Sequence, residues 1–159
     1  MSHQSSLKML KAASLLLIGL GLLFFLSVFT PVSGLSRLFL DLVIWPFDGR
    51  QSLDATETRL MIAISGGLLA GWGVMFWLVT TQVYATNPAL GGRIILPGIV
   101  TWFVIDSLGS ILAGAAVNAL LNITFLVIFV VPVVLRSPEE ARDTGSGTAA
   151  SIPGPTTPQ

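Results

Sequence analysis

The chain has 159 residues, of which 53% are hydrophobic and only 10% are charged, whereas soluble domains contain about 25% charged residues. So few polar residues cannot cover the core of a soluble fold, and the mean hydropathy of +0.84 also indicates a membrane protein. The formal net charge of zero gives no electrostatic basis for a nucleic-acid partner.

Metal and cofactor chemistry is restricted by residue usage. Without cysteine, the chain cannot form disulfides, thiolate zinc sites or cysteine-held iron–sulfur clusters. The single histidine, His3, precedes every apolar run, so a haem in the membrane has no evident ligand. We therefore expect no metal site, no catalytic residues and no cofactor.

The first apolar run predicts a transmembrane helix over residues 12–30, ended by Pro31. Residues 1–11 are then an N-terminal tail, and its Lys8 and Lys11 mark the boundary. A basic region before an apolar run also describes a signal peptide, with Val32-Ser33-Gly34 as a weak cleavage candidate. The run is longer than most signal cores, so we favour a retained helix.

The first loop predicts a helix that lies along the membrane interface over residues 35–45. Apolar side chains recur there at helical spacing, whereas Arg37 and Asp41 fall elsewhere on the wheel. Pro46 to Gly49 then predicts a turn. The next charge-poor run predicts a second transmembrane helix over residues 55–83.

Two further spans are predicted over residues 94–115 and 118–135, with Pro97 in the first turn of the third helix. The alternative is one helix over residues 94–135, but at 1.5 Å per residue it would be about 60 Å long. No single bilayer accommodates that length, so two helices are favoured. Residues 137–159 predict a disordered tail, because they are rich in Gly, Ser, Thr and Pro. The sequence thus predicts an all-α, membrane-embedded four-helix bundle over residues 12–136.

The distribution of basic residues predicts the orientation. With four spans, both termini lie on one side, together with Lys8, Lys11, Arg93, Arg136 and Arg142. The other side carries Arg37, Arg50 and Arg59 beside the acids Asp41, Asp48, Asp54 and Glu57. Basic residues concentrate on the cytoplasmic side, so we expect both termini in the cytoplasm.

One acidic residue, Asp106, falls in the middle of a predicted span. An acid at the bilayer centre costs roughly 2.5–3.5 kcal/mol on insertion scales. Apart from Arg59, which lies at the interfacial start of the second span, no lysine or arginine falls within a predicted span, so we expect hydrogen bonding in place of an ion pair. The candidate intramembrane polar cluster comprises Asp106, Ser110, Asn118 and Asn122.

The spacing of this cluster predicts how the third and fourth helices face each other. Asp106, Ser110 and Gly114 are spaced by four and share one helix face. A reversal of the chain near residue 116 would set Ser110 opposite Asn122 and Gly114 opposite Asn118. Polar side chains on facing helices can hydrogen-bond across their interface.

The second span carries a stripe of small residues that predicts close helix packing. They are Ala63, Gly66, Gly67, Ala70 and Gly71, and Gly114 is a further packing candidate. Small residues let helix backbones approach closely. We expect this face to run antiparallel to the third span, at the depth of Asp106.

The polar cluster has three interpretations. Polar residues at a helix interface often serve only to hold the helices together. A proton or ion relay and a ligand site within the bundle are the alternatives. An aspartate costs more to place in the membrane than a serine or an asparagine, and this cost favours the alternatives.

The stretch Trp102-Phe103-Val104-Ile105-Asp106-Ser107, followed by Ser110, Gly114, Asn118 and Asn122, resembles a family of small four-helix integral membrane proteins of bacteria without an established function. Gly71-Trp72-Gly73 and the loop from Leu38 to Gly49 are similar too, so the resemblance covers roughly residues 35–132. It implies a bacterial inner-membrane location and supplies no activity.

Three functions are open on this basis. The first is a non-enzymatic structural or accessory membrane protein, surrounded by lipid and assembled with itself or in a larger membrane complex. The second is a small oligomeric transporter or proton-linked channel that uses Asp106. The third, a membrane enzyme, is the least favoured, because one intramembrane acid supplies no acid–base pair.

Overall fold

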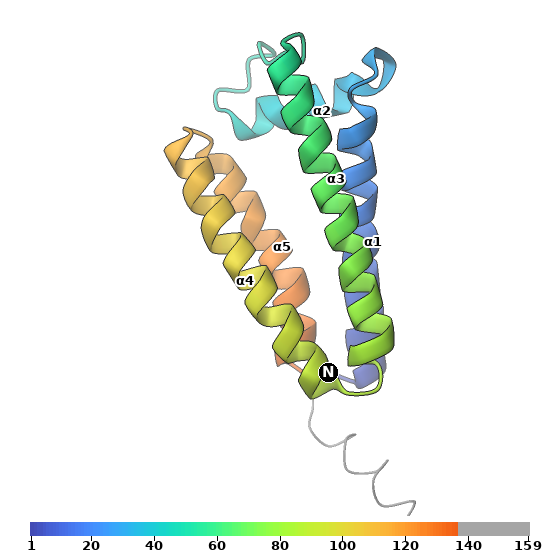
Figure 1. Ribbon diagram of the computed structural model, residues 1–159. Helices are drawn as coiled ribbons and strands as arrows, with labels where there is room; N and C mark the ends of the chain where they lie inside the picture. Colours follow the sequence, from blue (N-terminus) through green and yellow to red (C-terminus); the bar gives the residue numbers. More distant parts are fainter. Residues whose placement is uncertain (137–159) are drawn as a thin grey trace, which may run out of the picture.

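The computed structural model describes residues 1–136, and its regular structure over that range is entirely helical (Figure 1). The elements are α1 (His3–Leu26), a short 3₁₀ turn η1 (Thr30–Val32), α2 (Ser33–Val43), α3 (Thr56–Leu78), its π-helical continuation η2 (Val79–Tyr84), α4 (Pro88–Leu112) and α5 (Ala116–Val134). The predicted all-α fold is confirmed. The tail predicted over residues 137–159 lies outside the described residues.

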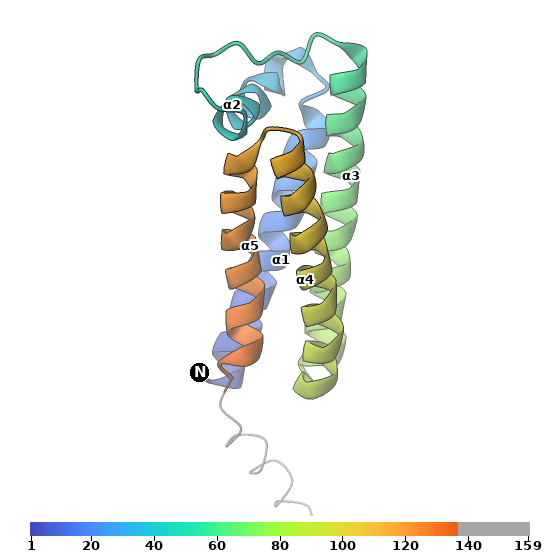
Figure 2. The same cartoon turned by 90° about the vertical axis from the view of Figure 1, so that its left-hand side faces the viewer.

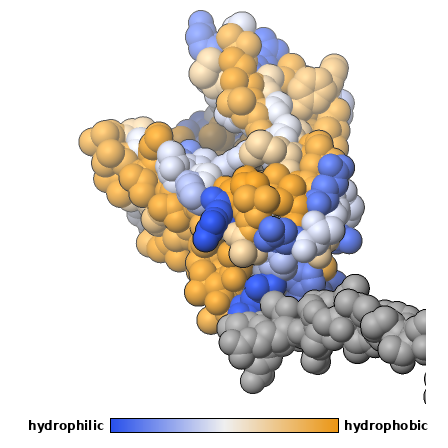
Figure 3. All heavy atoms as spheres, turned by 60° about the horizontal axis from the view of Figure 1, so that its bottom comes forward, coloured by the Kyte–Doolittle hydropathy of each residue, from blue (hydrophilic) through white to orange (hydrophobic). Residues whose placement is uncertain are grey.

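Four of these segments are long and apolar enough to cross a membrane: α1, α3 with η2, α4 and α5. The shortest has 19 residues, or about 29 Å at 1.5 Å per residue, close to the roughly 30 Å of a bilayer core. Large apolar side chains face outwards, among them Leu68 at 70% and Leu112 at 79% exposure, and Figure 3 shows hydrophobic residues over much of one face. The protein is a multi-pass membrane protein.

Two helix starts differ from the prediction, because local caps begin each helix earlier. α1 starts at His3, since the Ser2 hydroxyl accepts a hydrogen bond from the Ser5 amide at 3.2 Å. The N-terminal tail predicted over residues 1–11 is therefore largely helical. α4 starts at Pro88, after Asn87 caps the Leu90 amide at 3.0 Å, so Pro97 lies inside the helix and not in its first turn.

The spans form two antiparallel pairs, α1 with α3 and α4 with α5 (Figures 1 and 2). The first pair meets backbone to backbone. A Cβ placed on Gly66 would lie 2.6 Å from the Gly21 carbonyl oxygen, and one on Gly21 would lie 2.3 Å from the Ala70 nitrogen. The prediction that this small-residue face packs on the third span is wrong. It packs on α1, where Gly21 has no side chain and lets the two backbones come into contact.

The two pairs meet at the end that holds the N-terminus. A buried aromatic core lies there, in which the rings of Phe76 and Phe129 are 4.6 Å apart. The Tyr84 hydroxyl, fully buried, donates to the Pro132 carbonyl oxygen at 3.1 Å. The N-terminal amine donates to the Leu135 carbonyl oxygen at 2.8 Å. These contacts tie α3, its continuation η2 and the start of the chain to α5 and the residue after it, at what we call the terminal end.

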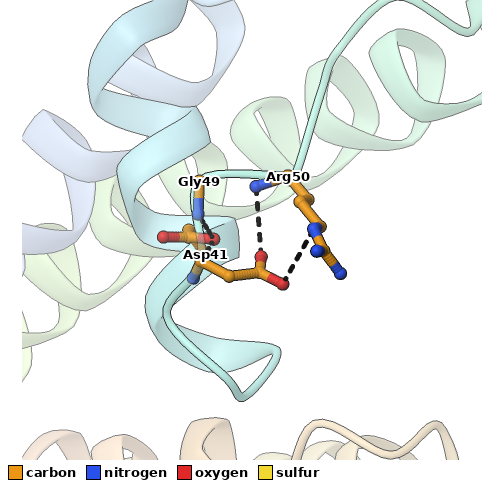
Figure 4. A network of polar contacts seen from close by, with 4 residues as sticks. Asp41, Gly49 and Arg50 are labelled. Carbon is orange, nitrogen blue, oxygen red and sulfur yellow. Dashed lines mark hydrogen bonds and ion pairs between the residues drawn. The ribbon is translucent and has the colours of Figure 1, made fainter.

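At the opposite end, α2 lies across the bundle near the turn between α4 and α5 (Figure 2). The hydroxyls of Ser27 and Ser36 are hydrogen-bonded and anchor α2 to the end of α1. The buried Asp41 carboxylate accepts from the amides of Asp48 and Gly49, at 3.3 and 2.8 Å (Figure 4). Asp48 pairs in turn with Arg50 at 3.4 Å. The helix expected in the first loop is confirmed, and its place at the membrane interface stays a prediction.

Candidate functional site

A pocket of about 950 Å³ lies between the two helix pairs. Leu17, Leu20 and Phe24 of α1 form part of its apolar lining, and the other four helices also contribute. Leu68, which lines the pocket, is 70% exposed. The pocket is therefore open to the outer surface of the bundle, where the lipid lies.

Asp106 of α4 is held by two asparagines of α5. Its Oδ2 atom accepts from Asn118 Nδ2 at 3.1 Å and from Asn122 Nδ2 at 2.7 Å. Asn118 also donates to the Ser110 hydroxyl at 2.8 Å, and Asn122 to the Ser107 hydroxyl at 3.1 Å. The structure thus brings together all four predicted cluster residues and joins α4 to α5 through them.

The pairing within the cluster differs from the predicted register. Ser110 bonds Asn118 and not Asn122, and Asn122 bonds Ser107, which sequence analysis missed. The chain reverses at Gly114, whose φ of +81° is the left-handed conformation that ends helices. That reversal comes earlier than residue 116, so the pairs shift by one helical turn. The one signal for Ser107 in the sequence was that it directly follows Asp106.

Asp106 lies nearer to one end of its helix than predicted. Because α4 runs from Pro88 to Leu112, Asp106 falls in the last part of the helix, towards α2. The prediction that it lies at the middle of a span is wrong, because the helix begins earlier than expected. Asp106, Asn118 and Asn122 all line the pocket, so the cluster forms part of its wall.

The predicted small residues have separate roles. Gly66 and Ala70 pack against α1. Gly67 and Gly71 have no atom within 4 Å of a placed Cβ, and both line the pocket. Gly114 likewise has none, and its role is in the turn. The prediction that these three glycines lie at close helix contacts is therefore wrong. Gly67 and Gly71 instead leave room in the pocket.

An aromatic layer lies one helical turn from the polar cluster, towards the terminal end. Trp102 precedes Asp106 by one turn on α4, and its ring centroid is 5.6 Å from Trp72 of α3 and 6.1 Å from Phe125 of α5. All three rings line the pocket. On the other side, Phe24 and Phe39 pair at 5.1 Å and also line it. The pocket thus combines apolar and aromatic walls with one carboxyl–amide cluster.

Comparison of the chain with models of known protein families, with curated proteins and with solved structures finds no match in any of the three. The resemblance to a bacterial membrane family therefore stays a prediction.

Proposed function

We propose that the protein is a non-enzymatic accessory component of the membrane, which holds a lipophilic molecule from the bilayer between its two helix pairs. The observation that carries this proposal is the pocket of about 950 Å³ beside a hydrogen-bonded polar cluster. Small-molecule sites have volumes of roughly 300–1,000 Å³ and mostly apolar walls with a few placed polar groups. The pocket has the same character.

The polar cluster supports a binding role as well as a packing role. A cluster that serves only to hold α4 and α5 together is explained by the hydrogen bonds between these helices. It does not require the same side chains to face a pocket, yet Asp106, Asn118 and Asn122 line one. An acid in that wall is costly in lipid, and such residues commonly mark substrate or ion sites.

We place the protein in a bacterial inner membrane with both termini in the cytoplasm. The terminal end carries Lys8, Lys11, Arg93 and Arg136, whereas every acidic residue among residues 1–136 lies elsewhere. This asymmetry follows the rule that basic residues stay on the cytoplasmic side. Labelling of introduced cysteines in intact cells at residues 8 and 50 tests this orientation.

A transporter that uses Asp106 is the second candidate, because an acid in the wall of an intramembrane pocket commonly marks a substrate or ion path. Flux of the bound molecule in proteoliposomes, lost in Asp106→Asn while the protein still assembles, would favour transport. Binding without flux would favour the accessory role.

The test of binding is extraction. Full-length protein purified in mild detergent is expected to release a stoichiometric lipophilic compound into organic solvent, detectable by mass spectrometry. Gly71→Phe should abolish it, since Gly71 lines the pocket and has free space at its Cβ. Gly98→Phe is the matched control, because Gly98 has the same free space and does not line the pocket. Equal recovery from both folded variants would overturn the proposal.

A further inference from the structure

The N–H donors of the polar cluster are consumed by bonds within it. Each of Asn118 and Asn122 donates once to Asp106 and once to a serine hydroxyl, and an amide nitrogen has two hydrogens to give. Within residues 1–136, both bonds to Asp106 go to Oδ2, and Oδ1 accepts none. The cluster therefore offers the pocket a carboxyl oxygen and amide oxygens, which are acceptors.

Among residues 1–136, no positively charged group pairs with Asp106. The one ion pair among the described residues joins Arg50 to Asp48 in the first loop. Among the residues that the structure describes, Asp106 is also the only ionisable side chain that lines the pocket. A bound molecule with a positive charge would give this carboxylate the partner that it lacks, and charged donors make the stronger hydrogen bonds.

The aromatic layer favours the same class of ligand. The faces of tryptophan and phenylalanine attract a cation within about 6 Å of the ring centroid, tryptophan most strongly. Trp102 lies one turn from Asp106 on α4 and packs against Trp72 and Phe125, and all three line the pocket with Asp106. The remaining walls are chiefly aliphatic, so the rest of the ligand must be apolar.

We propose that the pocket binds a lipophilic cation, with its positive charge at Asp106 and its apolar groups against the aromatic layer. This proposal rests on the proposed binding function and adds the sign of the ligand's charge. A carboxylate beside aromatic rings discriminates by charge, because an anion of equal size would meet Asp106 as a like charge.

Two ions of matched shape test it: tetraphenylphosphonium, a cation, and tetraphenylborate, an anion. Full-length protein in neutral detergent is titrated with each, and bound ion is measured by equilibrium dialysis against protein-free micelles. We expect saturable binding of one tetraphenylphosphonium per chain and none of tetraphenylborate above the micelle background. Asp106→Asn should weaken cation binding at least tenfold, and it keeps an oxygen that can accept from both asparagines.

Asp54→Asn is the matched control, since Asp54 is exposed, lies outside the pocket and carries the same charge. It should bind the cation as the parent does. Equal binding of both ions, or unchanged cation binding by folded Asp106→Asn, would overturn the charge assignment and leave the apolar pocket standing. If Asp106→Asn does not fold, Trp102→Leu is tested in its place. It should weaken cation binding severalfold, and cation binding equal to that of the parent would count against the proposal. Binding of neither ion would also overturn it, and extraction would then decide the proposed function separately.

Discussion

The contact between α1 and α3 makes Gly66 far more sensitive to an added methyl group than its neighbour Gly67. A Cβ at Gly66 would lie 2.5 Å from the Phe25 nitrogen and 2.6 Å from the Gly21 oxygen. Both are rigid backbone atoms, so Gly66→Ala must push the helices apart by on the order of 1 Å. At Gly67 there is no atom within 4 Å of the added group.

The magnitude follows from comparing the two variants. Replacing glycine by alanine inside a helix stabilises by roughly 0.5–1 kcal/mol, and this gain is common to both. Overpacking costs about 1–3 kcal/mol and applies only to Gly66. We therefore expect Gly66→Ala to be less stable than Gly67→Ala by about 1–3 kcal/mol, or roughly 5- to 150-fold in the unfolding equilibrium.

The assay is equilibrium unfolding of full-length protein in mixed micelles with increasing sodium dodecyl sulfate, followed by tryptophan fluorescence. Gly67→Ala should unfold at the parent's detergent fraction or above it, and Gly66→Ala clearly below. Coincident curves for the two variants would refute the close approach of α1 and α3 at Gly66.

Three further outcomes are expected. Tyr84→Phe should lower the free energy of unfolding by about 1 kcal/mol, measured in the same assay, because it removes the buried bond to Pro132; no change would mean that this bond does not tie α3 to α5. The double variant Ser27→Cys, Ser36→Cys should form a disulfide in air, because the two hydroxyls are hydrogen-bonded and the chain has no other cysteine. A gel shift on reduction detects the disulfide, and persistently free thiols would count against the placement of α2. Asp41→Ala should make the loop after α2 more sensitive to protease, because two backbone amides lose their acceptor; unchanged cleavage would contradict this role.

The spans could be predicted because lipid excludes charge over a fixed thickness, so charge-free runs mark the crossings. The first helix start was wrong because Lys8 and Lys11 were treated as its boundary. A lysine does not end a helix, and Lys11 lies over the Trp77 ring at 5.8 Å from its centroid. Long side chains of this kind reach polar surroundings from within a helix.

The polar cluster could be predicted because residues four apart share a helix face. Its register was predicted wrongly because the reversal was placed near residue 116, whereas the chain turns at Gly114, the one glycine in that stretch and the residue that most readily takes the left-handed conformation. The partner of the small-residue stripe could not be predicted either. A stripe shows that some backbone approaches closely, and only the structure identifies it as α1, through Gly21.

The pocket had no signal in the sequence. Gly67 and Gly71 belong to the same run of small residues as Gly66, yet they face open space. The two helix pairs meet at the terminal end, around Tyr84 and Phe129. The pocket is the space that remains between them beyond that contact. Spacing along one helix cannot reveal a gap between two pairs of helices.

Photolabelling of the intact membrane with an apolar diazirine that is dissolved in the bilayer tests the central claim most directly. If the pocket is open to molecules from the lipid, Trp72 and Trp102 should be labelled in the peptide map, and Gly71→Phe should protect them while Gly98→Phe does not. If Trp72 and Trp102 stay unlabelled while the outward-facing Leu112, which lies outside the pocket, is labelled, the pocket is closed to the lipid and the central claim is contradicted.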